Sequence, residues 1–141
     1  MRKSMIEIPL TPISLRCRRK ALGLTRAELG DLIGAPASAI RSWEIGKSSP
    51  RDSKSVNMLL SSLEVAALDC VDKLTTPSDC EIEDGGVSPT VLISYVDQVA
   101  YEQYCEWADK IPLSMYQACV GDAAVLLADH GLNVSIIART S

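Results

Sequence analysis

The spacing of apolar and polar residues over the first fifty positions predicts three short helices. Each begins at a residue that caps or opens a helix, and each is followed by a glycine that ends it. The clearest start is Thr25, because Glu28 three residues later completes a capping box. The expected helices span residues 12–22, 26–33 and 36–45.

A longer apolar stripe follows and predicts a fourth helix from about residue 52 to residue 74. Its seam repeats at a spacing of 4-3-4-3-4, as in a heptad. Further apolar positions widen the seam, which is typical of a helix packed on a globular core. The residues of the seam are Val56, Leu60, Leu63, Ala67, Cys70 and Leu74.

The pattern changes after residue 74, which divides the chain into three parts. Residues 75–89 are rich in Pro, Gly, Ser and acidic residues and lack apolar periodicity, as expected of a linker. Beyond it the pattern predicts strands and helices in the order β-α-α-β. Their expected ranges are 91–96, 99–107, 113–128 and 133–138. We therefore expect a domain at 1–74, a linker at 75–89 and a second region at 90–141.

These elements predict a mainly α fold: an N-terminal bundle of the five-helix type, of which four helices are predicted here, followed by a small α/β region. Two strands alone make a poor sheet. The hypothesis that follows is that a partner chain completes the sheet and that the C-terminal region is a dimerisation region. Five of the six aromatic residues lie in this part of the chain, which indicates a core or an interface. A small-molecule pocket is the alternative.

The second and third helices carry the most specific pattern in the chain. Leu29, Ile33, Ile40 and Trp43 are spaced to face one another across a tight turn at Gly34, the geometry of a helix-turn-helix. The segment LRCRRKALGLTRAELGDLIGAPASAIRSWEIGKSSP resembles the Cro/C1-type, or XRE-family, helix-turn-helix. The resemblance includes the GLT before the second helix, the WExG that ends the third and the trailing proline.

The resemblance implies a DNA-binding transcriptional regulator whose third helix enters the major groove of double-stranded DNA. It also implies an ion pair between Arg19 and Glu44 that ties the first helix to the third. Thr25 and Arg26 begin the second helix, where backbone N–H groups favour a phosphate. A plain N-cap is the alternative role of Thr25.

The resemblance and the chemistry of the side chains together give further candidate DNA contacts. Arg41 is the strongest of them, because arginine can bind guanine O6 and N7 in a bidentate manner. Basic residues after the third helix are candidates for phosphate contacts, with a solvated surface charge as the alternative for any single one. The candidates for base contacts are Ala37, Ser38, Ala39, Arg41 and Ser42, and those for phosphate contacts are Lys47, Arg51 and Lys54.

Two positions depart from the family pattern. Gly30 stands where a small alanine is usual, and helix propensity predicts that it loosens the second helix by about 1 kcal/mol. Residues 35–37 read Ala-Pro-Ala, which removes a side-chain N-cap from the third helix.

Charge is divided between the two halves of the chain. The formal net charge is −4, which alone argues against nucleic acid. Residues 1–60, however, carry 11 basic and 5 acidic side chains, whereas residues 61–141 carry 3 basic and 13 acidic ones. A basic front half can approach phosphates while an acidic back half points away.

Other kinds of chemistry have little support in the sequence. The five cysteines form no CxxC pair and the chain has one histidine, His130, so we expect no metal site and no cofactor. The acidic run 79–84 lies in the expected linker, and no nucleophile-and-base arrangement indicates an enzyme. We expect no signal peptide and no membrane span, and therefore a cytoplasmic, nucleoid-associated protein.

The C-terminal region contains Trp107, the segment Ile111-Pro112-Leu113, Met115-Tyr116 and a long following helix. In these features it resembles the dimerisation part of small phage and bacterial repressors of the anti-CRISPR-associated type. This resemblance implies a homodimer that binds a pseudo-palindromic operator and represses its own promoter. An antitoxin whose acidic C-terminal half binds a basic toxin is the alternative. An effector-gated sensor is a third reading.

Overall fold

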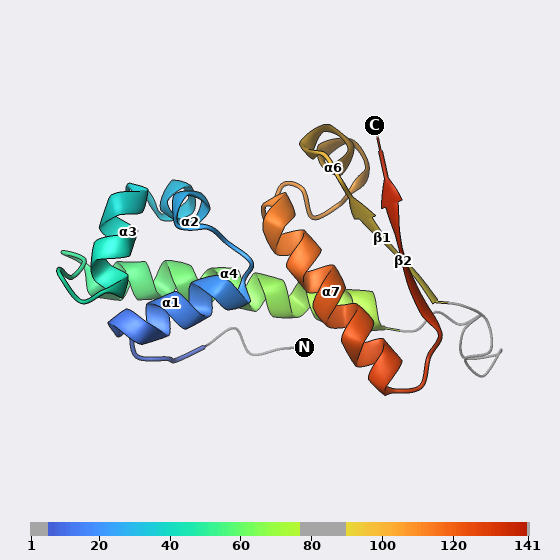
Figure 1. Cartoon of the computed structure of the whole chain (residues 1–141), viewed down its shortest axis with the longest axis horizontal. Helices are drawn as coiled ribbons and strands as arrows, with labels where there is room; N and C mark the ends of the chain where they lie inside the picture. The colour runs from blue at the N-terminus through green and yellow to red at the C-terminus, as the bar shows by residue number, and fades with distance from the viewer. Residues whose placement is uncertain (1–5, 77–89, 141) are drawn as a thin grey trace. The chain divides into compact units, whose positions relative to one another are not determined.

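The computed structural model describes residues 6–76 and 90–140. They form a mainly helical fold with a small α/β region in the C-terminal part, which confirms the expected fold class (Figure 1). The chain divides into two compact units, Met1–Val65 and Ala66–Ser141, so the division falls inside a helix. The expected linker lies outside the described residues, apart from Thr75 and Thr76. The expected domain boundaries remain a prediction.

The first unit is built on four described helices, the last of which continues into the second unit. Their positions agree with the apolar pattern to within about two residues, the usual uncertainty of a helix end. They are α1 (Pro12–Ala21), α2 (Arg26–Ile33), α3 (Ala37–Glu44) and α4 (Ser53–Thr75).

Capping residues set the starts of these helices. The Thr25 hydroxyl accepts a hydrogen bond from the Glu28 N–H at 3.1 Å, and the Glu28 carboxylate accepts one from the Thr25 N–H at 2.9 Å, which confirms the capping box. The helix ends at Gly34, whose φ of 78° lies in the left-handed region that favours glycine. Pro36 precedes α3 without a side-chain cap, as expected.

Aliphatic side chains fill the core of the first unit. Leu15 of α1, Leu29 of α2, Ile40 of α3 and Leu60 of α4 are each at most 1% exposed. Each of the four helices therefore contributes a fully buried side chain to the core, and α3 packs against both α1 and α2.

The second unit has the expected order β-α-α-β. Its elements are β1 (Thr90–Tyr95), α6 (Gln98–Tyr104), α7 (Leu113–Asp129) and β2 (Val134–Arg139). The two strands pair in parallel, with Thr90 opposite Val134 and Tyr95 opposite Arg139. Helix α7 packs against both strands and crosses one face of the pair in Figure 1.

Helix α6 is shorter than the sequence predicts. The expected helix reaches residue 107, but Cys105 adopts an extended conformation at φ −103° and ψ 130° and ends the helix after Tyr104. The chain then turns so that Trp107 is only 9% exposed. Burial of this indole in the core outweighs continued helix in a segment that contains neither Gly nor Pro.

The aromatic residues of the second unit form part of its core. Tyr95, Tyr101 and Tyr116 are mutually in contact, with ring centroids 5.4–5.9 Å apart. The Tyr101 hydroxyl is buried and donates to the Ile111 carbonyl at 2.7 Å. Of the two readings of this aromatic cluster, these contacts favour a core.

Candidate nucleic-acid interface

The turn between α2 and α3 is held by apolar contacts and by a close backbone approach. Leu29 and Ile40 are fully buried on its inner side, whereas Ile33 and Trp43 are half-buried. The N–H groups of Gly34 and residue 35 both donate to the Gly30 carbonyl, at 2.8 and 2.9 Å. The chain therefore turns directly over the end of α2 before α3 begins.

Gly30 has a role in this turn in addition to the loss of helix propensity that the sequence predicts. A Cβ atom built on Gly30 would lie 2.1 Å from the Ala35 carbonyl oxygen, whereas real Cβ atoms essentially never come closer than 3.0 Å to a neighbour. The absence of a side chain at this position lets the Ala35 carbonyl pass over α2. Glycine here sets the approach of α3 to α2.

A buried carboxylate joins α1, α2 and α3 at the base of the turn. Arg19 donates to both oxygens of Glu44, from Nε at 2.6 Å and from Nη2 at 3.1 Å. Arg26 donates from Nε to Glu44 Oε1 at 3.0 Å. The Glu44 side chain is 0% exposed and that of Arg19 is 8% exposed. Two arginines on two helices thus hold the last residue of α3.

The protonation of Glu44 follows from these contacts. Burial alone raises the pKa of the carboxyl, but hydrogen bonds and charge from Arg19 and Arg26 outweigh burial, so the pKa lies below its ordinary value. Glu44 is therefore ionised at neutral pH. A third contact fixes Arg19 further, because its Nη1 donates to the Leu24 carbonyl at 2.8 Å.

Arg26, a candidate phosphate contact, also makes a contact inside the protein. Its Nε binds Glu44, and its side chain is 31% exposed. Its charge is therefore partly balanced inside the protein. No local sequence pattern predicts this contact, because Arg26 and Glu44 are brought together only by the angle between α2 and α3.

The outer face of α3 carries the residues expected to contact bases. Ala37, Ser38 and Arg41 are exposed, whereas Ala39 and Ser42 are half-buried. The Ser42 hydroxyl shares a hydrogen bond of 2.7 Å with the hydroxyl of Ser48 in the following loop. The polar groups that are most accessible on α3 are thus those of Ser38 and Arg41.

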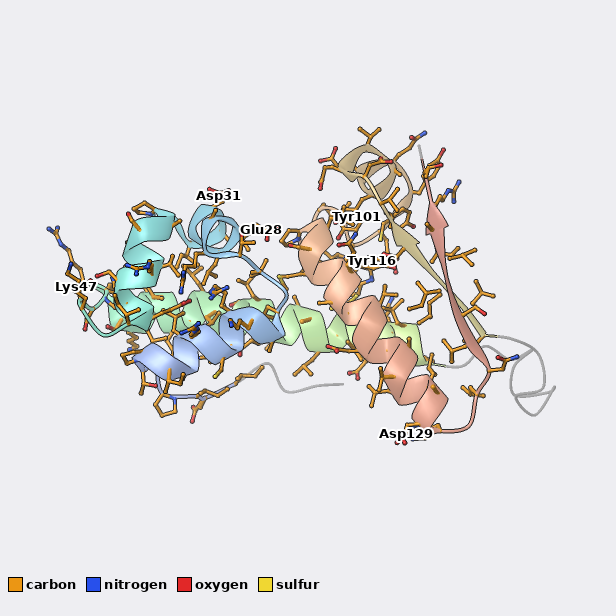
Figure 2. The ribbon with its side chains drawn as sticks, viewed as in Figure 1. Glu28, Asp31, Lys47, Tyr101, Tyr116 and Asp129 are labelled. Atoms are coloured by element: carbon orange, nitrogen blue, oxygen red, sulfur yellow. The ribbon has the colours of Figure 1, made fainter. Side chains whose placement is uncertain are left out.

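The residues expected to contact phosphates lie at the margins of this face. Thr25 is exposed at the start of α2, where its hydroxyl caps the helix. Lys47 and Arg51 are exposed in the segment between α3 and α4, and Figure 2 shows Lys47 extending from the loop after α3. Lys54, in the first turn of α4, is exposed as well. The side chains of Lys47, Arg51 and Lys54 are thus all accessible to a ligand.

A second buried arginine was not found by sequence reasoning. Arg18 is 6% exposed and donates to Glu64 of α4 at 2.9 Å and to the Asn57 amide oxygen at 2.6 Å. It also donates to the Ile8 carbonyl at 3.3 Å, and Asn57 donates to the same carbonyl at 2.9 Å. Arg18 and Glu64 are 46 residues apart, so local spacing gives no signal for the pair. The cluster holds α1 and residues 6–9 on α4.

A metal-binding cluster and a membrane-spanning helix are both absent from residues 6–76 and 90–140. In those ranges no group of three or more His, Cys, Asp and Glu side chains is arranged to hold a metal ion. The helices within the same ranges are all too short or too polar to cross a membrane.

A helix-turn-helix that presents a polar helix face from a basic segment defines the class of DNA-binding transcription regulators. Residues 15–58 match the family model for the helix-turn-helix, which confirms the resemblance carried by this segment. No curated protein matches the chain. The family match covers α1, α2, α3 and the start of α4, so the resemblance drawn for the C-terminal region has no support from it.

Proposed function

We propose that this protein is a sequence-specific transcriptional repressor that binds a pseudo-palindromic operator as a homodimer. The observation that carries the proposal is the exposed face of α3, with Arg41 at its centre, on a helix whose last residue is held by two arginines. A rigidly held helix can present the same side chains to each half-site. Repression would follow from occupation of a promoter by the bound dimer.

Each candidate residue has a role in this proposal. Arg41 would bind guanine, Ser38 and Ser42 would hydrogen bond to base edges, and the alanines at 37 and 39 would contact thymine methyl groups. Phosphates would be bound by Thr25, Arg26, Lys47 and Arg51. Because Arg26 is already paired with Glu44, the greater share of phosphate binding falls to Lys47 and Arg51. We place the protein in the cytoplasm, on the nucleoid.

The test begins with selection of bound DNA from a random pool, followed by titration of the selected site. A symmetric consensus with half-site centres about 34 Å apart, or a multiple of that, is the expected result. Recovery of DNA without a consensus at moderate salt would overturn the proposal.

Two substitutions then separate base contacts from phosphate contacts. Arg41→Ala should weaken the selected site by about 1–3 kcal/mol and relax the choice of base at one position in each half-site. Lys47→Ala should weaken binding to all DNA sequences equally. It should also reduce the slope of the logarithm of the binding constant against the logarithm of the salt concentration by about 1. Lys73→Ala, an exposed lysine in the C-terminal unit, is the matched control and should leave binding unchanged.

An antitoxin is the second candidate, and the charge of the C-terminal unit favours it. The described residues of that unit carry eight acidic and three basic side chains, a surface suited to a basic protein. Co-expression with the product of an adjacent gene for a small basic protein would test it. A stable complex that forms with the C-terminal unit would support the antitoxin, and its absence would leave the repressor as the function.

A further inference from the structure

Both faces of strand β2 are exposed to solvent, whereas one face of β1 is buried. Ile136 is 51% exposed and its neighbour Ile137 is 49% exposed, and because successive residues of a strand point to opposite faces, both faces of β2 are open. In β1, by contrast, Leu92 is only 6% exposed. Leu92 lies opposite Ile136 in the ladder, so these two side chains share the covered face of the sheet. Helix α7 packs against both strands, yet Ile136, on the outer strand of the pair, remains half exposed.

One edge of β2 also lacks a hydrogen-bonding neighbour among the described residues. Its other edge pairs with β1 along its whole length, from Val134 to Arg139. Exposed sheet edges are usually protected by proline, lysine, a bulge or an inward charge. The sequence VSIIAR has none of these before its terminal arginine. An apolar edge of this kind is a template for another strand.

The charge of β2 favours a second copy of this chain as the partner that pairs with its free edge. The C-terminal unit is acidic over its described residues, so most of its surfaces would repel a second copy. Strand β2 carries no acidic residue, and its one charge, Arg139, lies at its end. Two copies can thus approach along β2 without opposing like charges at the centre. A basic partner protein would be drawn instead to the acidic surfaces, not to this neutral strand.

We propose that β2 pairs with β2 of a second copy, antiparallel and centred on Ile136, to form a four-stranded sheet in the order β1-β2-β2-β1. A two-fold axis perpendicular to the sheet reverses the strand direction and keeps each face continuous. Ile136 then lies opposite the partner's Ile136 and is covered on the face where Leu92 is already buried. Four strands reach the size at which sheets are usually stable.

This inference rests on the proposed function, because a two-fold operator requires two copies. Light scattering of the full chain at micromolar concentration should give twice the chain mass. Ile136→Lys places two like charges opposite each other and should raise the dimer dissociation constant by about a hundredfold. The lysine can reach solvent in the separated chain, so the circular dichroism spectrum should be unchanged. Val125→Lys, on the exposed side of α7 where Val125 is 70% exposed, is the matched control and should remain dimeric.

The outcomes separate this inference from the proposed function. A monomeric wild-type chain, or an Ile136→Lys variant that remains dimeric, overturns the pairing of β2. If the wild type binds a two-fold operator while Ile136→Lys stays dimeric, the repressor function stands and the interface lies elsewhere. If the wild type is a dimer that Ile136→Lys dissociates but no DNA sequence is selected, the interface stands and the function fails.

Discussion

Replacement of Gly30 by alanine tests whether the turn between α2 and α3 depends on the missing side chain. Helix propensity alone predicts that alanine stabilises α2 by about 1 kcal/mol. The geometry predicts the opposite, because the new Cβ would lie 2.1 Å from the Ala35 carbonyl oxygen. That oxygen cannot move alone: Pro36 restricts the residue before it, and the N–H of Ala35 is bound to the Gly30 carbonyl at 2.9 Å.

The expected magnitude follows from these two opposing effects. Overpacking of a folded structure costs about 1–3 kcal/mol, and a clash with fixed backbone belongs at the upper end of that range. After the gain in propensity is subtracted, Gly30→Ala should destabilise the first unit by about 1–2 kcal/mol. For a unit of this size, each kcal/mol lowers the melting temperature by about 4–8 °C.

Gly121→Ala is the matched control for this experiment. Gly121 lies inside α7, and a Cβ atom there would meet no other atom within 4 Å. Alanine should therefore stabilise α7 by up to about 1 kcal/mol. Urea unfolding followed by far-ultraviolet circular dichroism and by tryptophan fluorescence measures both variants. A Gly30→Ala variant as stable as wild type, or more stable, would refute the role assigned to the turn.

Two further predictions concern the ionised and the buried side chains. Glu44→Gln should destabilise the first unit by about 3 kcal/mol at pH 7, since it leaves Arg19 without its carboxylate. Because the pKa of Glu44 is lowered in the folded state, its stabilisation is complete above the ordinary carboxyl range and is lost as the pH falls through the lowered value. The urea concentration at the unfolding midpoint, measured from neutral to acid pH, should therefore become equal for wild type and Glu44→Gln at low pH. A difference between the two midpoints that does not change with pH would contradict this. Iodoacetamide with mass mapping should modify exposed Cys17 well before Cys70 and Cys119, because both of those thiols are at most 3% exposed. Equal rates would show that the core of the second unit opens readily.

The positions of most helices could be predicted from the sequence because capping residues and glycines mark where they begin and end. Helix α2 spans the predicted residues because Thr25 with Glu28 sets its start and Gly34 sets its end. The two predicted strands begin and end within one residue of β1 and β2. The predicted end of α6 was wrong because no Gly or Pro marks it. The helix ends at Cys105, and the chain beyond it buries Trp107.

Contacts between distant residues were predictable only where a motif supplied them. The Arg19–Glu44 contact came from the family pattern, and the structure places the two at hydrogen-bonding distance. The contacts of Arg26 with Glu44 and of Arg18 with Glu64 depend on interhelical angles that no local pattern encodes. The same limit applies to Gly30, whose role depends on where the Ala35 carbonyl points.

The small accessible surface of α3 places a constraint on the proposed repressor. Arg41 and Ser38 are its most accessible polar side chains, and the hydroxyl of Ser42 is shared with Ser48. A well-formed bidentate contact discriminates against a wrong base by about 1–3 kcal/mol, whereas specific sites are preferred over random DNA by about 4–10 kcal/mol. One helix with a single arginine cannot supply that difference. The remainder has to come from a second copy, from half-site spacing and from DNA shape. Loss of dimerisation through β2 should therefore reduce operator selectivity more than Arg41→Ala does.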